Sequence, residues 1–239
     1  MTTQNPNISL KGKVAFVSGA SKGIGVSIAE LFAAAGCDLA LTARNEQELE
    51  QTAENARKSG VKVWTKTAEM ADADEVKAVG NAALAEFGHI DILVNNAGVT
   101  IPQPILETTL DNFHTIINVN VLAPFLLTQI FAPSMIAKKK GKIVNVTSRA
   151  AIRAFPTGSV YSASKGALQL LTQSMAVEFG PHNIQTNSVA PTVTMTPMGD
   201  NAWPPSPRRD AKLAKIPTGR FAEPEEVADT VLYLASENS

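Results

Sequence analysis

A tyrosine, a lysine and a serine are spaced in this sequence in a way that suits proton transfer. Tyr161 and Lys165 lie four residues apart, and Ser148 lies thirteen residues before the tyrosine, at the end of an apolar run. On a helix, residues four apart share one face. A phenol has a pKa of about 10, and a nearby ammonium favours its ionised form. We therefore expect Lys165 to lower the pKa of Tyr161, so that the phenol can act as general acid or base.

Ser148 and the next residue, Arg149, add hydrogen-bond donors to this group. The hydroxyl of Ser148 can donate to a substrate oxygen on which negative charge develops. Arg149 is suited to bind a carboxylate, sulfonate or phosphate, because its guanidinium forms two parallel hydrogen bonds with such groups. Simpler interpretations stay open: a packed tyrosine beside a surface lysine, and an arginine that points to solvent. Ser148, Arg149 and Tyr161 are the candidate substrate contacts.

A glycine-rich stretch lies between an apolar run at residues 14–17 and an amphipathic stretch over residues 23–36. Glycine there permits a tight turn and lets backbone N–H groups approach a pyrophosphate at the start of a helix. The spacing G-x-x-x-G-x-G differs from the usual G-x-G-x-x-G, and glycines at such turns also occur without any ligand. The residues expected around the dinucleotide phosphates are Gly19, Ser21, Lys22, Gly23, Ile24 and Gly25.

The end of the second expected strand, residues 39–42, indicates which dinucleotide is bound. An acid at this place binds the ribose 2′-hydroxyl of NAD, whereas a basic residue accommodates a 2′-phosphate. The chain has Arg44 there and no acid, and Lys22 of the glycine stretch can approach the same place. We therefore expect NADP(H), with two unspecific surface cations as the alternative. Glu69 and Met70 follow the third strand and are expected beside the adenine.

Short apolar runs alternate with longer amphipathic stretches along the whole chain, which predicts one α/β domain with a doubly wound parallel sheet of the Rossmann type. Residues 1–9 are expected to form a flexible tail and residues 10–239 the domain. The last strand of such a sheet is expected to be missing from the chain. The strands are expected at residues 14–17, 39–42, 61–64, 92–94, 143–146 and 184–189, and the helices at 23–36, 45–59, 73–87, 109–137, 159–179 and from about 224 onward.

One stretch, residues 191–220, interrupts this alternation and is expected to be irregular. Such a segment late in an α/β chain is a candidate substrate lid, which we place at about residues 192–220. A plain surface crossover is the alternative. Trp203 lies in this segment and is a candidate substrate contact, with ordinary loop packing as the other interpretation.

Charge and composition weigh against several classes of function. The net charge of −1 implies no general affinity for nucleic acid or anionic membranes. The single cysteine and the three scattered histidines indicate neither a disulfide framework nor a metal site. The first residues lack the features of a secretory signal, and no apolar run reaches membrane-spanning length. A cytoplasmic protein that binds neither nucleic acid nor membrane, and holds no metal, is expected.

Six motifs, in order along the chain, resemble those of the short-chain dehydrogenase/reductase family. They are the glycine stretch after Ser18, Asn95-Asn96-Ala97-Gly98, Asn120, Ser148, the Tyr161/Lys165 pair and the turn from Pro191 to Thr196. The resemblance implies a catalytic tetrad of Asn120, Ser148, Tyr161 and Lys165, with Tyr161 and Lys165 also holding the nicotinamide ribose. It further implies that Asn95 and Ala97 line the adenosine side, and that Pro191, Val193, Thr194 and Thr196 hold the carboxamide.

The segment from Pro191 to Gly199 with Trp203 is similar to that of the dicarbonyl/xylulose reductase branch, which also has a lysine and an arginine at the positions of Lys22 and Arg44. This resemblance implies NADPH-linked reduction of a keto-sugar or a small dicarbonyl by a homotetramer or dimer. Two other functions stay open. One is a 3-oxoacyl acyl-carrier-protein reductase, which the arginines 149, 153, 208 and 209 would favour. The other is a catalytically silent NADP-binding scaffold, against which the complete tetrad argues.

Overall fold

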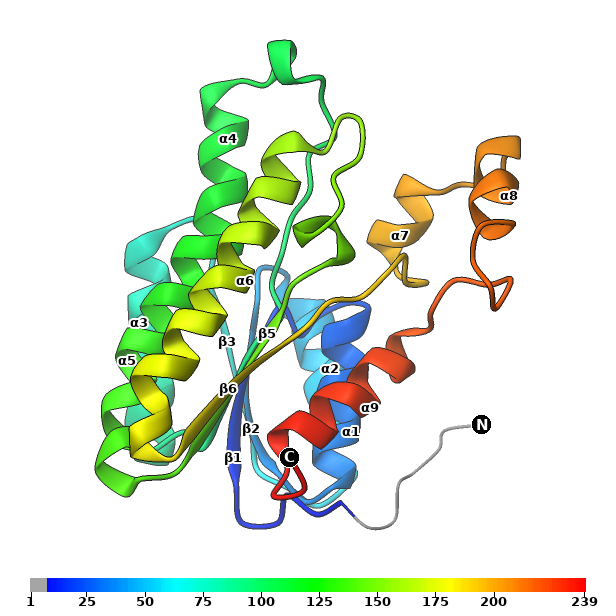
Figure 1. Ribbon diagram of the computed structural model, residues 1–239. Helices are drawn as coiled ribbons and strands as arrows, with labels where there is room; N and C mark the ends of the chain where they lie inside the picture. The colour runs from blue at the N-terminus through cyan, green and yellow to red at the C-terminus, as the bar shows by residue number, and fades with distance from the viewer. Residues whose placement is uncertain (1–7) are drawn as a thin grey trace.

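Six parallel strands form the sheet at the centre of the structure, a computed structural model that describes residues 8–239 (Figure 1). The strands lie in the order β3-β2-β1-β4-β5-β6. The order reverses between β1 and β4, as it does in dinucleotide-binding folds. The strands are β1 Val14–Ser18, β2 Asp38–Ala43, β3 Val63–Thr67, β4 Ile92–Asn95, β5 Gly141–Val146 and β6 Ile184–Val189. The predicted doubly wound parallel sheet is therefore confirmed.

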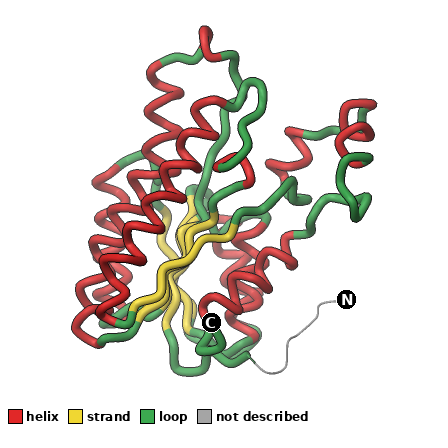
Figure 2. The backbone as a smooth tube through the Cα atoms, viewed as in Figure 1, coloured by secondary structure: helices red, strands yellow, loops and turns green. Residues whose placement is uncertain are grey.

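Helices cover both faces of this sheet (Figure 1, Figure 2). Alternate residues of each strand therefore enter different cores. Val17 packs with α1 and α9, whereas Phe16 packs on the other side, where its ring centroid lies 5.0 Å from that of Phe131. One face carries α1 Ile24–Ala34, α2 Glu46–Arg57 and α9 Pro224–Ala235; the other carries α3 Ala73–Phe87, α5 Ala123–Lys138 and α6 Ser159–Phe179.

The long helix expected over residues 109–137 is interrupted by a π-helical turn. It consists of α4 Leu110–Ile117, the π turn η2 Asn118–Leu122, and α5. Pro124 has no N–H to donate to the carbonyl of Asn120 four residues earlier, so a regular α-helix cannot be completed at this point. π turns occur mostly at functional sites, and this one carries Asn120.

This helix, Leu110–Lys138, is long and apolar enough to cross a membrane: it has 29 residues, and the mean hydropathy of its best window is 1.6. The expectation that no apolar segment reaches that length is therefore wrong. Half of the window is buried inside the domain, where α5 packs on α3 and beneath the sheet. The helix is a core element of this fold, and length and composition alone are weak evidence for a membrane.

The segment expected to be irregular contains two short helices, α7 Pro197–Ala202 and α8 Pro207–Leu213. Each begins with a proline, and the hydroxyl of the preceding residue, Thr196 or Ser206, accepts a backbone N–H of the first turn. This pair of a capping hydroxyl and a proline at the first position is a helix-start signal, so the prediction of an irregular segment is wrong. A bridge between Thr194 and Ala222 closes the base of the excursion, which projects from the body in Figure 1.

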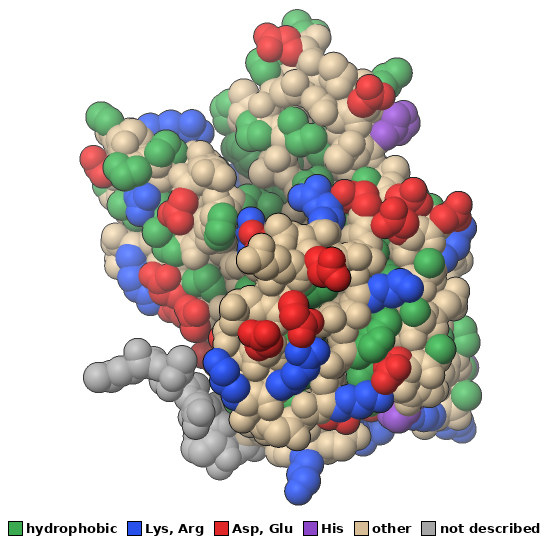
Figure 3. All heavy atoms as spheres, turned by 180° about the vertical axis from the view of Figure 1, so that it is seen from behind, with side chains coloured by type: hydrophobic (Ala, Val, Ile, Leu, Met, Phe, Trp, Pro, Cys, Tyr) green, Lys and Arg blue, Asp and Glu red, His purple; other side chains and the backbone are tan. Residues whose placement is uncertain are grey.

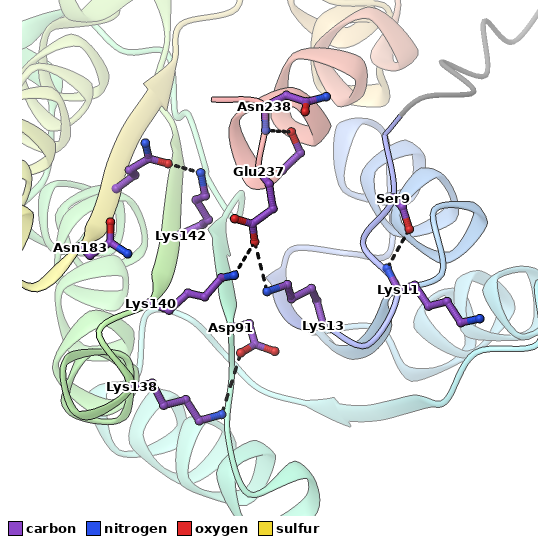
Figure 4. Close-up of polar contacts among 12 residues, drawn as sticks. Ser9, Lys11, Lys13, Asp91, Lys138, Lys140, Lys142, Asn183, Glu237 and Asn238 are labelled. Carbon is purple, nitrogen blue, oxygen red and sulfur yellow. Dashed lines mark hydrogen bonds and ion pairs between the residues drawn. The ribbon is translucent and has the colours of Figure 1, made fainter.

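The chain after α9 is held against the amino edge of the sheet by ion pairs (Figure 4). Glu237 lies 3.2 Å from Lys13 Nζ and 2.8 Å from Lys140 Nζ, and Asp91 lies 4.0 Å from Lys138 Nζ. The lysine run at the end of α5 thus contributes to the packing of the domain. Within residues 8–239 no strand follows β6. Residues 1–7 of the expected tail lie outside the described residues.

Acidic and basic side chains are intermixed over the face turned away from the viewer in Figure 1, which Figure 3 shows. Charged side chains of the structure also form ion pairs, such as that of Lys62 with Glu86 at 2.6 Å. This distribution accords with the net charge of −1.

Candidate active site

The loops that follow β1 and β4 separate at the carboxyl edge of the sheet, where the strand order reverses. Such a switch point is where open α/β sheets bind their ligands. Two residues connect the loops: the hydroxyl of Ser18 accepts the N–H groups of Asn96 and Ala97, each at 3.1 Å. The amide of Asn96 donates to the carbonyls of Ser18 and Gly19, both at 3.0 Å. These contacts fix the glycine loop relative to Ala97.

The glycine loop enters α1 with backbone angles and close contacts that favour glycine. Gly19 has φ 68°, and a Cβ on it would lie 2.8 Å from Ala97 Cα. Gly23 has φ 54°, caps α1 without any side-chain hydrogen bond, and no acid occupies the first turn. The first N–H groups of α1 therefore have no side-chain partner, and they suit an anion such as a pyrophosphate. Ser21 and Lys22 lie in this loop and Ile24 is the first residue of α1, and their contact with a cofactor stays a prediction.

The two cations expected to bind a 2′-phosphate each lie beside a glutamate. Arg44 Nη1 lies 3.5 Å from Glu69 Oε2, and Lys22 Nζ lies 2.7 Å from Glu48 Oε1. Both cations are exposed, so a phosphate can reach them, although it would compete with the carboxylates. The glutamate Glu48 was not singled out from the sequence.

Two residues expected along the adenosine turn their side chains into the fold. Met70 is only 5% exposed and packs in the core, so contact with an adenine would have to come through its main chain. Asn95 is 1% exposed, and its amide donates to Asn145 Oδ1 at 2.8 Å, with Asn145 in turn donating to Thr172 at 2.8 Å. A side-chain role for Asn95 and Met70 at the ligand is thus disfavoured, and main-chain contacts stay a prediction.

Ser148 and Tyr161 are brought together from the end of β5 and the first turn of α6. The two hydroxyls lie close enough to interact by a side-chain hydrogen bond. Burial raises the pKa of Tyr161, and this hydrogen bond opposes the rise. The ring of Phe155 lies beside that of Tyr161, with centroids 6.3 Å apart. The sequence placed these two hydroxyls together correctly, but nothing in it indicated the effect of burial.

Lys165 lies one helical turn after Tyr161 and is enclosed by protein, with 3% of its surface exposed. Its ammonium donates to Val146 O at 2.8 Å and lies 6.0 Å from the centroid of the Tyr161 ring. Burial lowers the pKa of Lys165 to about 8. The expected lowering of the tyrosine pKa by Lys165 is not found: burial of the phenol raises this pKa, and the opposing effect comes from Ser148.

Asn120 is fully buried in the π turn and connects three segments. Its side chain accepts the N–H of Val99 at 2.9 Å and donates to Val99 O at 3.0 Å and to Ser164 Oγ at 2.9 Å. A Cβ on Gly98 would lie 3.1 Å from Lys165 Nζ and 3.4 Å from Asn120 Oδ1. Asn120, Lys165 and the chain after β4 therefore meet at one point.

The loop after β6 returns to both halves of the site. Thr196 lies against the glycine loop, since a Cβ on Gly23 would be 2.8 Å from Thr196 Cγ2. Pro191 O accepts the N–H of Arg149 at 2.9 Å, which ties this loop to η3 Arg149–Ala151, directly after Ser148. The residues predicted to hold a carboxamide, from Pro191 through Val193 and Thr194 to Thr196, thus lie between the glycine loop and the tetrad.

Trp203 ends α7, and its surroundings are those of a packed residue. Its ring centroid lies 6.3 Å from that of Phe221, and the cations of Arg208 and Lys212 lie 4.6 Å and 5.5 Å from it. This favours the loop-packing interpretation, and a substrate contact stays a prediction. Over residues 8–239 no cluster of three or more His, Cys, Asp or Glu side chains could hold a metal ion.

The comparisons with known proteins agree with this geometry. A profile of the short chain dehydrogenase family matches residues 13–206. L-xylulose reductase of Bos taurus is 42% identical over 98% of this chain and 93% of that protein. The 3-oxoacyl acyl-carrier-protein reductase of Thermotoga maritima is 36% identical over 96% and 93%. The solved gluconate 5-dehydrogenase of Burkholderia cenocepacia, in complex with NADP and tartrate, is 32% identical with a TM-score of 0.88, over 95% and 89%.

The chain therefore belongs to the short-chain dehydrogenase family and is an oxidoreductase that acts on CH–OH and C=O groups. The resemblance to this family and to its xylulose reductase branch is confirmed. Sequence reasoning quoted Asn96 and Gly98 only as part of a motif and missed Ser164 and Asn145. Their partners lie far away in the chain, so no local pattern could reveal them.

Proposed function

We propose that this protein is an NADP(H)-dependent oxidoreductase that interconverts the carbonyl of a keto-sugar or small dicarbonyl and the corresponding alcohol. The observation that carries the proposal is the meeting of Ser148, Tyr161 and Lys165 at the carboxyl edge of the sheet, beside a glycine loop whose helix-start N–H groups have no side-chain partner. Family membership supports the reaction class, and the relatives named above support the substrate class.

In the proposed reduction, Tyr161 supplies the proton to the substrate oxygen and Ser148 donates a hydrogen bond to the same oxygen. Burial keeps the phenol protonated, which is the form that reduction needs. Lys165 places a positive charge behind the tyrosine, and this charge favours departure of the proton. Asn120 holds the chain after β4 against Ser164, on the helix that carries both Tyr161 and Lys165.

The residues present fit a nicotinamide dinucleotide with a 2′-phosphate. The first N–H groups of α1 would hold the pyrophosphate, Arg44 and Lys22 the 2′-phosphate, and the loop from Pro191 to Thr196 the carboxamide. When bound, the nicotinamide supplies or accepts the hydride. NADP is present in the solved gluconate 5-dehydrogenase named above, which supports the same cofactor for this chain.

A second candidate reaction is reduction of a 3-oxoacyl group on a carrier protein. A relative with that activity is 36% identical, and arginines 149, 153, 208 and 209 give the lid and the turn after Ser148 a positive charge that an acidic carrier would fit. We rank it second because L-xylulose reductase shares more of the sequence, 42%.

The test of the proposed function is the variant Tyr161→Phe, assayed by NADPH oxidation with xylulose, diacetyl, an acidic keto-sugar and acetoacetyl thioesters. Loss of the proton donor should lower kcat by roughly 10²- to 10⁴-fold, the usual contribution of general acid catalysis. The Kd for NADPH, followed by fluorescence titration, should stay within about twofold, because the phenyl ring preserves the packing.

Tyr233→Phe is the matched control, since Tyr233 is 48% exposed on α9, away from the tetrad, and its loss should leave kcat unchanged. Turnover of Tyr161→Phe within a few-fold of the unmodified protein would remove Tyr161 from the proposed role. A carrier-bound thioester reduced far faster than any free carbonyl would establish the second candidate.

We also propose that the protein assembles as a homotetramer or dimer and acts in the cytoplasm. An open groove of about 590 Å³ between α5 and α6 supports assembly, because it is lined by apolar side chains such as Val121, Phe125 and Leu170. Phe125 is 39% exposed and Leu170 65%, which a second copy of the chain would cover.

A further inference from the structure

Cationic side chains gather on two segments beside Ser148. Arg149 lies in η3, directly after Ser148, and Arg153 follows two residues after η3; Lys212 lies on α8, and Lys215 follows that helix. Within residues 8–239 none of these four side chains lies within ion-pair distance of a carboxylate. Among the described residues, the positive charges of this cluster are therefore not neutralised by ion pairs with carboxylates.

The charges of the two segments lie close enough to act on one another. Burial and the positive charges of Arg149, Arg153 and Lys215 lower the pKa of Lys212. Exposed charges interact appreciably only within about 10 Å, the screening length at moderate ionic strength. The charges of η3 and α8 thus act on one another, although the two segments lie about sixty residues apart in the chain.

Most cations elsewhere on the surface contrast with this cluster, because they have a carboxylate beside them. Lys62 pairs with Glu86 at 2.6 Å, and Arg220 pairs with Glu226 at 2.6 Å. Like charges held together without a counter-charge raise the free energy of the folded protein, and a bound anion removes that cost. The arrangement of η3 and α8 therefore favours an anionic ligand.

Two contacts fix the segments that carry this charge, one beside Ser148 and one on the lid. Arg149 N donates to Pro191 O at 2.9 Å, so η3 is fixed next to Ser148, whose Cα lies about 3.8 Å from that of Arg149. On the lid, the ring of Trp203 lies 5.5 Å from Lys212 Nζ and holds that side chain near α7. An anion bound here would belong to the same small molecule as the carbonyl held by Ser148.

We propose that Arg149 and Lys212, assisted by Arg153, bind an anionic group on the substrate, so that the preferred substrate is a sugar-derived keto-acid rather than a neutral keto-sugar. This inference rests on the proposed function and narrows its substrate class. Arginine adds a planar pair of donors that matches a carboxylate. The cofactor's own 2′-phosphate is expected at Lys22 and Arg44, beyond the end of β2, which leaves the η3 and α8 cations for the substrate.

The experiment compares a keto-aldonate with the neutral ketose of the same chain length at saturating NADPH. The unmodified protein should prefer the keto-aldonate in kcat/KM. The double variant Arg149→Gln/Lys212→Gln should lose roughly 10- to 100-fold in kcat/KM for the keto-aldonate, chiefly through KM, which is the usual size of a charge-assisted contact. Its kcat/KM for the neutral ketose and its Kd for NADPH should change by no more than about twofold.

Lys11→Gln is the control variant, because Lys11 is an exposed cation at the opposite edge of the sheet (Figure 4). It removes one charge and should leave the preference unchanged. A phosphorylated ketose is the third substrate, and it distinguishes a carboxylate site from a phosphate site: faster turnover of the phosphate ester would identify phosphate as the anion and overturn the keto-acid assignment.

Failure of this inference is distinguishable from failure of the proposed function. Equal kcat/KM values for keto-aldonate and ketose, or equal losses for both in the double variant, would overturn the inference while leaving the reductase activity intact. If neither substrate is reduced, calorimetry with D-gluconate and the NADP⁺-loaded protein decides: binding that the double variant loses supports the anion site, and no binding refutes it. Exclusive turnover of a carrier-bound thioester would assign the cations to the carrier instead.

Discussion

Lys165 has 3% of its surface exposed, and its ammonium has one hydrogen bond within the protein, to Val146 O at 2.8 Å. Removing a charged ammonium from water raises its free energy, and burial therefore lowers the pKa of Lys165 from 10.5 to about 8. Tyr161 is affected in the opposite sense: burial disfavours its charged form and raises its pKa. Burial thus favours the neutral form of both side chains.

The depressed pKa of Lys165 predicts how stability depends on pH. Below about pH 8 the lysine is protonated in the folded and unfolded states, and the cost of its buried charge is fully present. Between about pH 8 and 10.5 only the unfolded state keeps the proton, so this residue's contribution to the free energy of unfolding rises with pH, by about 3 kcal/mol in total. This contribution is measured by urea denaturation of the unmodified protein and of Lys165→Met at pH 7.5, 8.5 and 9.5.

As pH rises, the free energy of unfolding of the unmodified protein should increase relative to that of Lys165→Met. The lost hydrogen bond to Val146 adds an offset that does not vary with pH, and all other titrating groups are common to both proteins. A difference that stays constant from pH 7.5 to 9.5 would show that Lys165 is hydrated or otherwise compensated.

The start of α1 and the loop before α7 are packed against each other beside the proposed site of the cofactor phosphates. Gly23 permits this contact, because it has φ 54° and its missing Cβ leaves room for Thr196. A side chain at this position would meet Thr196 Cγ2 at 2.8 Å and would move either the helix N-terminus or the carboxamide loop. The packing of α1 on the loop before α7, and with it the proposed cofactor site, therefore depends on the absence of a side chain at Gly23.

Gly23→Ala should raise the Kd for NADPH by tenfold or more. It should also lower the free energy of unfolding by about 1–3 kcal/mol, the cost of a left-handed backbone for a residue other than glycine. Gly60→Ala is the matched control: Gly60 has φ 78°, but nothing lies within 4 Å of its would-be Cβ. It should show a similar loss of stability in thermal unfolding with unchanged NADPH affinity. Equal affinities for the two variants would disconnect the Gly23 contact from cofactor binding.

Across the molecule, the two edges of the sheet differ in what they present. The amino edge carries ion pairs that hold the chain after α9, whereas the carboxyl edge carries the tetrad, the glycine loop and the unneutralised cations of η3 and α8. The outer face of α5 and α6 is a third region, apolar and open. The candidate active site, the ion pairs that hold the segment after α9, and the proposed assembly groove therefore lie on separate parts of the surface.

Assembly through this apolar groove predicts the effect of a charge placed in it. Phe125→Asp combined with Leu170→Asp should convert the oligomer to a monomer in sedimentation velocity, because two carboxylates would be buried without partners. Leu106→Asp is the control, since Leu106 is 97% exposed but lies outside the groove. An oligomer that persists in the double variant, or a monomeric unmodified protein, would contradict the proposal.

The sequence alone was sufficient for the architecture, and it also named the residues of the candidate site. Alternating periodicity predicts the parallel sheet, and residue spacing places Tyr161 and Lys165 on one face of α6, because helix and strand geometry depends on near neighbours. The tertiary structure alone determined the rest: the π turn at Asn120, the glutamates beside Lys22 and Arg44, and the effect of the η3 charges on Lys212. It also reversed the expected direction of the pKa of Tyr161. Burial and charge contacts join residues distant in the chain, and no local pattern encodes those distances.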